Sequence, residues 1–397
     1  MKKTIIFISV ALLILLFSCK SEMYVSNVNS KYLENTSGLI YALPKTKLEV
    51  EIEITETHKQ KGPFAEYTNL YFNTKNAITE NSTDYRISNI SINAKPVTDS
   101  ANIYCINSLD NEIASLINLT QNGFIAGINI SDYQSEKIET EQKNILTSNS
   151  NYNKFADYAD FSLKSIRETQ YDTIYKEVLQ DSVIVKIPII KKKEVYKSLK
   201  KQAKETADVL FLLRDDRNAL LKGENDGNNF PDGEALKLMI NELNKLEKQY
   251  MSLFTGQEIK VKKQYKFEII PNSQTTDSII YLFNFSENKG FYKTNSAKNA
   301  IYLKLNKNTD LISTSEFTKK AILSNKNKKG AYTGIIYRIP QNLTAEVINS
   351  KSTLYKKEIK IAQAGTLNII PAKLLKNTKV EFYPQYGSLK RISKIKE

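Results

Sequence analysis

Cys19 is the residue whose surroundings most clearly predict a chemical reaction. It follows two lysines, Lys2 and Lys3, an almost wholly apolar stretch over residues 4–17, and the small residue Ser18. The apolar stretch is shorter than the ~20 residues of a comfortable membrane span, so it is typical of an export signal. Its end resembles a bacterial lipobox, in which the cysteine thiol receives a diacylglyceryl group. We expect cleavage between Ser18 and Cys19 and lipidation of Cys19; the alternative is an ordinary secretory signal with an incidental cysteine.

The residues after Cys19 bear on the expected location. Lys20 stands where an Asp would resemble the inner-membrane retention signal of some lipoproteins, and Glu22 is the only acidic residue nearby. An acidic run that sends some lipoproteins to the cell surface is therefore missing. We expect a protein of the bacterial cell envelope whose lipid on Cys19 holds it in the outer membrane, on the periplasmic face.

Residues suited to metal or nucleophilic chemistry are scarce. His58 is the only histidine, so the chain offers neither a His-rich zinc site nor a recognisable Ser-His-Asp triad. Residues 224–229 have the oxygen-rich character of a calcium loop but lack its twelve-residue pattern with a closing glutamate. We expect His58 to lie at the surface, residues 224–229 to form a solvated turn, and the chain to have no catalytic residue, cofactor or metal site.

Paired carboxylates are the arrangement in this sequence that could still indicate an enzyme. Two close acids could cleave a glycosidic bond, but no pair stands out and tryptophan, a common sugar platform, is absent. The candidate pairs are Asp157 with Asp160, Asp215 with Asp216, and Glu224 with Asp226. A hydrolase acting on envelope glycans or peptides is the alternative function, and it would require two buried acids facing each other in a deep cleft.

Residues 214–217 read Arg-Asp-Asp-Arg and form the densest charge cluster. Arg217 falls on the apolar stripe of a predicted helix. We expect it to pair with a carboxylate of the following helix, such as Glu242 or Glu247. A structural ion pair is favoured here over a clamp for a ligand.

The net charge of +14 does not predict nucleic-acid binding. The basic residues are 51 lysines and only 6 arginines, and the lysines are scattered along the chain. Arginine is the usual residue for bidentate contacts to phosphates and base edges. We therefore expect no nucleic-acid partner.

Cys105 is the second of two cysteines. If Cys19 is acylated, Cys105 has no partner within the chain, and we expect a buried thiol.

Four triplets consist of Asp, then Ser or Thr, then an apolar residue. They are similar to the O-glycan acceptor triplet of some bacterial envelopes, although the beginning of a strand would explain them equally. The triplets begin at Asp99, Asp172, Asp181 and Asp277.

The sequence pattern predicts a mainly β protein of the α+β class, with antiparallel sandwich-like domains and an amphipathic helical hairpin between them. Strict alternation over residues 48–54 predicts a half-buried strand, and Asn122-Gly123 predicts a hairpin with a type I′ turn. Residues 171–190 have strand character that we expect to stop near Pro188. Apolar residues at helical spacing, with Gly223 after the first segment, predict the two helices.

These patterns divide the chain into six expected units. They are a leader over residues 1–18, a polar tether over 19–37, an N-terminal β-rich domain over 38–135, a linker or long loop over 136–160, strands followed by the helical hairpin over 161–256 (helices at about 196–222 and 233–254), and a C-terminal sandwich-like domain over 257–397.

Several stretches, in order along nearly the whole mature chain, resemble a family of envelope lipoproteins known as domain of unknown function four-eight-three-one. They include Tyr-Ala-Leu-Pro-Lys-Thr at 41–46, Gly-Pro-Phe at 62–64, Asp-Thr-Ile-Tyr at 172–175, Arg214 and Arg217 with Leu-Leu-Lys-Gly-Glu at 220–224, Asp-Gly-Glu-Ala-Leu at 232–236, Leu-Phe-Thr-Gly at 253–256, Tyr-Arg-Ile-Pro at 337–340 and Tyr-Gly-Ser-Leu-Lys at 386–390. The resemblance implies an envelope lipoprotein and no catalytic activity. Our expected function is a non-enzymatic binding or assembly module with an envelope protein or glycan as partner.

Overall fold

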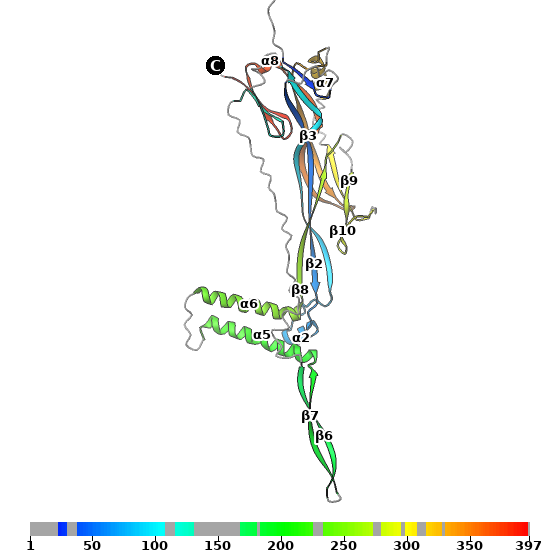
Figure 1. Ribbon diagram of the computed structural model, residues 1–397, viewed down its shortest axis with the longest axis vertical. Coiled ribbons are helices and arrows are strands. Elements are labelled where there is room, and N and C mark those ends of the chain that lie inside the picture. Colours follow the sequence, from blue (N-terminus) through cyan, green and yellow to red (C-terminus); the bar gives the residue numbers. More distant parts are fainter. Residues whose placement is uncertain are drawn as a thin grey trace, which may run out of the picture.

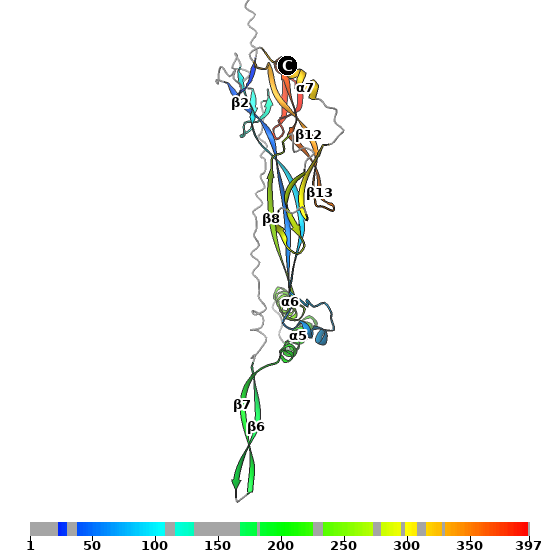
Figure 2. The same cartoon turned by 90° about the vertical axis from the view of Figure 1, so that its right-hand side faces the viewer.

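The protein is elongated and mainly β in a computed structural model (Figures 1 and 2). The structure describes residues 23–29, 38–107, 116–130, 167–180, 183–224, 233–272, 279–294, 298–307, 315–327 and 330–395. Its strands form several antiparallel sheets, and two helices pack as a pair, which confirms the fold class expected from the sequence.

Two long strands form the spine of the molecule. β2 (Leu39–Gln60) and β3 (Ser82–Asn107) pair antiparallel from Leu39↔Ile106 to Lys59↔Ser82. At about 3.3 Å per residue, the 22 residues of β2 span roughly 70 Å. β8 (Gln257–Ile269) pairs with residues 48–60 of β2, and β1 (Tyr24–Asn27) pairs with residues 104–107 of β3. We refer to the extremity of the molecule that contains β1 as the β1 end.

A second sheet packs against this spine as a sandwich. Its order is β10 (Gly290–Tyr292), β9 (Ile279–Ser286), β11 (Ala300–Lys307), β12 (Gly334–Ile348) and β13 (Thr353–Pro371). The predicted alternation in β2 is confirmed, since its apolar residues face this sheet while the intervening acids face outward. The buried members from the spine are Leu48, Val50, Ile52, Ile54, Ile90 and Ile92.

A third sheet and a separate core complete the β1 end. The sheet order is β15 (Ser388–Lys394), β14 (Thr378–Tyr383), β5 (Ile125–Ile128) and β4 (Ile117–Leu119), with α7 (Ser315–Ser324) and α8 (Ala372–Leu375) nearby (Figure 1). Because β14 pairs with β5 and β8 pairs with β2, the stretches 38–135 and 257–397 do not pack as separate N- and C-terminal domains. Both stretches contribute strands to the sheet that contains β2 and to the sheet that contains β14, and both contribute residues to two hydrophobic cores. Together they bury more apolar surface than either stretch could alone.

The stretch expected to be a polar tether, 19–37, is ordered in part. Met23 and Val25 are buried in the core at the β1 end, and β1 pairs with β3. The apolar residues of this short segment fasten it to the sheet, so only the three residues 20–22 separate Cys19 from the described fold.

The helical hairpin is fastened to the tip of the β2–β3 spine. It consists of α5 (Leu199–Lys222) and α6 (Gly233–Thr255), and it packs on η1 (Ala65–Tyr67) and α2 (Thr68–Phe72) (Figure 1). The hydroxyl of Thr68 donates to the carbonyl of Phe254 at 2.8 Å, and the N–H of Phe64 donates to the carbonyl of Leu253 at 2.9 Å. Phe254 is fully buried among the rings of Phe64 and its neighbours, so the tip and the hairpin form one packed unit.

A two-stranded ribbon continues beyond the helical hairpin at the other extremity (Figures 1 and 2). β6 (Arg167–Gln180) and β7 (Val183–Tyr196) pair along their whole length, and no other described strand joins them. The 14 residues of each strand span about 45 Å.

Some sequence expectations about strands were wrong in detail. β7 continues through Pro188, because the proline is opposite Tyr175 in a ribbon with a free outer edge. The predicted hairpin at Asn122-Gly123 is present, but only Gly123 has a positive φ, so the turn is not type I′. β12 and β13 are each one continuous strand, and the register between them shifts at Ile339/Gln341 and at Val347/Ile348. Within the described residues no helix is long and apolar enough to cross a bilayer.

Candidate functional site

Several residues singled out from the sequence lie outside the described residues. These are Ser18, Cys19, Asp157, Asp160, Asp181, Asp226, Asp277 and the linker 136–160. The turn at 224–229 is described only at Glu224, which is exposed. Asp215 and Asp216 are exposed on α5 and are not brought opposite another acid. No candidate pair of carboxylates is therefore assembled in a cleft by the described part of the chain.

The most buried acid of the outer sheet face is Glu49 on β2. It lies within 2.7 Å of Lys95 and 3.3 Å of Lys266, which come from the two neighbouring strands. Burial alone would raise the pKa of Glu49, but hydrogen bonds and charges from the two lysines outweigh it and lower the pKa below its usual value. Glu49 is thus a structural anion that ties three strands together.

His58 belongs to a similar arrangement around Glu56. Its Nε2 lies 3.2 Å from Glu56, whose other oxygen lies 2.5 Å from Lys263 and which also accepts from the hydroxyl of Tyr85 at 3.1 Å. Burial opposes ionisation of Glu56, yet Lys263 and Tyr85 lower its pKa. His58 is two-thirds buried rather than a free surface residue, since its other ring nitrogen lies 3.1 Å from Thr83.

The third buried acid, Asp99, joins the spine to β12. Its side chain accepts from Arg338, from Lys45 at 2.9 Å and from Asn102 at 2.8 Å, and Arg338 also donates to the carbonyl of Pro44 at 2.8 Å. Burial works against ionisation, but these donors lower the pKa of Asp99. A general acid needs a raised pKa, so none of the three buried carboxylates in the described chain is poised for proton donation near neutral pH.

The charge cluster on α5 pairs with α6 as expected. Arg217 and Arg214 both contact Glu247, the latter at 2.6 Å. Partial burial raises the pKa of Glu247, but the two guanidinium groups outweigh it and the pKa is lowered. The prediction that Arg217 pairs with the second helix is confirmed.

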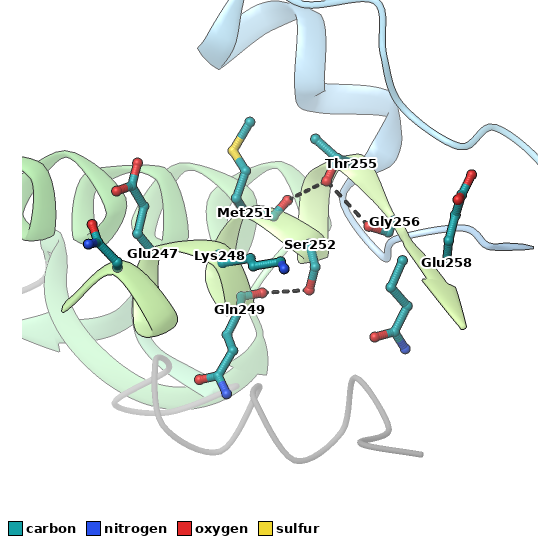
Figure 3. Close-up of a pocket in the computed structure, with 10 residues that line it drawn as sticks. Glu247, Lys248, Gln249, Met251, Ser252, Thr255, Gly256 and Glu258 are labelled. Carbon is teal, nitrogen blue, oxygen red and sulfur yellow. Dashed lines mark hydrogen bonds between the residues drawn. The ribbon is translucent and has the colours of Figure 1, made fainter. Parts of the chain in front are cut away.

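A hollow of about 680 Å³ runs along α6 and the start of β8 (Figure 3). Of its two acids, Glu247 is already held by the two arginines, and its hydroxyls are used by the helix itself. Ser252 donates to the carbonyl of Gln249 at 2.6 Å, and Thr255 donates to that of Met251 at 3.1 Å (Figure 3). The acid and the two hydroxyls are therefore already engaged within the protein, and no cluster of metal-binding side chains occurs among the described residues.

The β6–β7 ribbon exposes apolar side chains of the kind that are usually buried in a protein. Every ribbon residue except Glu168 and Val195 is exposed, although the two strands are rich in β-branched and aromatic residues. Twelve of its large apolar side chains are exposed, a higher density than on any other pair of neighbouring elements described. They are Tyr171, Ile174, Tyr175, Val178, Leu179, Val183, Ile184, Val185, Ile187, Ile189, Ile190 and Tyr196. Monomeric proteins seldom expose contiguous apolar surface of this kind unless it binds a partner.

Both faces of the ribbon are apolar, which distinguishes it from a one-sided strand pair. Residues directly opposite share a face, so Ile174 and Ile189 lie on one face, and Leu179 and Ile184 lie on the other. Strands that are apolar on both faces are typical of sheet interiors. An isolated two-stranded ribbon is only marginally stable in water. No other described strand pairs with this ribbon to stabilise it.

The base of the ribbon is fastened firmly to α5. Glu168 pairs with Lys201 in the first turn of α5, and the guanidinium of Arg167 donates to the hydroxyl of Tyr196 at 3.0 Å. Ser198 caps α5 two residues after β7 ends. The ribbon is therefore held in a defined direction by the helical hairpin.

A family model described as "Domain of unknown function (DUF4831)" matches residues 37–390. The chain belongs to this family. No curated protein and no solved structure matches the chain. The matched residues include the whole β6–β7 ribbon, so the ribbon is part of the DUF4831 domain and not an appendage to it.

Proposed function

We propose that this DUF4831 protein is a lipoprotein of the bacterial cell envelope, anchored in the outer membrane through Cys19, and that it serves there as a non-enzymatic assembly module. Its binding surface in this proposal is the β6–β7 ribbon, and its partner is a protein. The observation that carries the proposal is the exposure of both apolar faces of a long ribbon that the body holds in a fixed direction.

The position of the ribbon supports this role. The β1 end begins at Met23, four residues after Cys19, and four residues reach at most about 14 Å. A lipid on Cys19 would therefore hold the β1 end close to the membrane. The ribbon lies at the opposite extremity (Figures 1 and 2), where it would meet partners away from the anchoring site.

The chemistry of the buried acids favours binding over catalysis. Glu49, Glu56 and Asp99 are each paired with lysine or arginine. The described residues therefore contain no pair of facing buried acids of the kind that the alternative function, a hydrolase, would require. The backbone edges of the ribbon favour a protein partner over lipid, because hydrocarbon cannot satisfy unpaired N–H and C=O groups.

Photocrosslinking in intact cells tests the proposal. A benzoylphenylalanine at Tyr175, which is 64% exposed, should give a crosslinked protein product, and one at Leu238 on α6, which is 63% exposed, should not. Equal products at both sites, or none at Tyr175, would refute the ribbon as the binding surface.

Substitution of Cys19 tests the anchor. Cys19→Ala should release the protein to the soluble fraction or leave it unprocessed; a lipidated mutant would refute the anchoring.

A further inference from the structure

The two outer edges of the ribbon differ in their ability to accept another strand. Pro188 in β7 is opposite Tyr175 in an uninterrupted ladder, so its nitrogen, which has no hydrogen to donate, faces away from β6. The outer edge of β7 thus lacks a donor in its middle. β7 also carries Lys186 and the run Lys191–Lys193, and lysine and proline are the residues that block edge pairing.

The outer edge of β6 has no such protection. β6 contains no proline, and because the pair Tyr175–Pro188 is not hydrogen-bonded, Tyr175 directs its own N–H and C=O outward. By the two-residue period of a strand, Thr173 and Glu177 do the same. β6 therefore presents a regular row of donors and acceptors that no described strand uses.

The side chains of β6 complement themselves in one antiparallel register. A two-fold axis at Ile174 places Asp172 of one copy opposite Lys176 of the other, twice. An axis at Asp172 or at Lys176 would instead place like charges opposite, which destabilises a sheet. Within the described residues neither Asp172 nor Lys176 makes an ion pair, so both charges are available.

We propose that the partner of the ribbon is a second copy of this chain, joined by antiparallel pairing of β6 with β6 about a two-fold axis at Ile174. This rests on the proposed function and names its partner. The pairing makes a four-stranded sheet in the order β7-β6-β6-β7, with the protected edges outermost. It is isologous and closed, so it yields dimers and not fibres.

The two-fold axis sets the direction of the two molecules. In each copy the β1 end lies opposite the ribbon (Figure 1). Antiparallel β6 strands point the two bodies away from each other, so in this pairing the β1 ends lie at the far extremities of the dimer. Both lipid anchors reach one membrane only when this long dimer lies along the membrane surface.

Disulfide trapping of the full-length lipoprotein tests the register. In this pairing Ile174 meets its own copy at a non-hydrogen-bonded position, where side chains are closest. Ile174→Cys should give a covalent dimer under mild oxidation. The matched control is Ile189→Cys, which is on the same face at 39% exposure against 40% but on the protected strand β7. Equal trapping by the two variants, or none by Ile174→Cys, would overturn the proposal.

Charge exchange gives a test that does not depend on a new cysteine. Asp172→Lys or Lys176→Asp alone should weaken self-association about tenfold or more in sedimentation, because each places like charges opposite at both contacts. An equimolar mixture of the two variants should restore dimers, since every contact then pairs Lys with Asp. Failure of the mixture to restore them would overturn the pairing.

The two proposals fail differently. If benzoylphenylalanine at Tyr175 crosslinks only to a different envelope protein, the self-pairing is overturned and the ribbon stays a binding surface. If it crosslinks to nothing, both are overturned. A product of twice the mass of the chain, identified as the chain itself, supports both.

Discussion

Removing the charge of Asp99 should destabilise the protein more than removing Arg338, although the two form one ion pair. Both side chains are almost fully buried, at 1% and 4% exposure of the residues. In Asp99→Asn the guanidinium of Arg338 keeps its hydrogen bond to the carbonyl of Pro44, but this buried cation is left without its counter-charge. Breaking a buried pair in this way costs about 3–5 kcal/mol.

The reverse substitution leaves a better-compensated group. In Arg338→Met, Asp99 retains Lys45 at 2.9 Å and Asn102 at 2.8 Å, so we expect a loss of about 1.5–3 kcal/mol, the range for a hydrogen bond to a charged group. The double variant removes both charges and should cost at least about 1 kcal/mol less than the sum of the two single variants.

Urea unfolding followed by circular dichroism measures these differences, because the chain has no tryptophan to report by fluorescence. The control is Glu381→Gln, whose partner Lys390 is 3.6 Å away on an exposed sheet face, and it should cost less than about 1 kcal/mol. Equal losses in the two single variants, or strict additivity in the double variant, would refute this account of the pair.

Three further predictions concern the helical hairpin, the response to acid and the buried thiol. Arg217→Leu should lower hairpin stability by about 0.5–1 kcal/mol, seen as faster hydrogen exchange in α6, while crosslinking through the ribbon is unchanged; loss of crosslinking at an unchanged melting temperature would contradict this. The folded-state pKa of Glu49 is lowered despite burial because lysines on β3 and β8 outweigh it, so its contribution to stability is complete above an unfolded value near 4.5 and is lost as the pH falls through the lower folded value. Glu49→Gln should therefore shrink the drop in unfolding free energy between pH 7 and pH 3, and an unaltered pH profile would count against the ion pair. Burial raises the pKa of the Cys105 thiol, so it should react with Ellman's reagent far more slowly in the native protein than in urea; equal rates would show that the thiol is accessible.

The regular elements followed from local patterns. The alternation over residues 48–54 predicted which side of β2 is buried, because side chains on a strand alternate between two faces. The apolar stripe with Gly223 at its end predicted α5, and Arg217 on that stripe predicted its ion pair with α6. Family membership was also visible in short stretches spread along the chain.

The pairing of distant segments could not be predicted in the same way. Asp99 and Arg338 are 239 residues apart, and nothing near either one indicates the other. The pairing of β14 with β5 merges two expected domains, because unsatisfied sheet edges join whichever complementary strand the topology brings near. The ion pairs of Glu49, Glu56 and Asp99 could not be predicted either, because their lysine and arginine partners come from other strands.

By itself the sequence determined the helical hairpin, the strand-rich composition and the likeness of residues 15–19 to a lipidation signal, because each depends on residues close together in the chain. Only the tertiary structure decided that the strands at 167–196 stand apart from every described sheet. A run of valines and isoleucines has the same pattern in a buried strand and in an exposed one, since periodicity records which residues share a face and not what covers that face. The uncovered ribbon is therefore a property of the packed molecule, and it is the feature on which the proposed function depends.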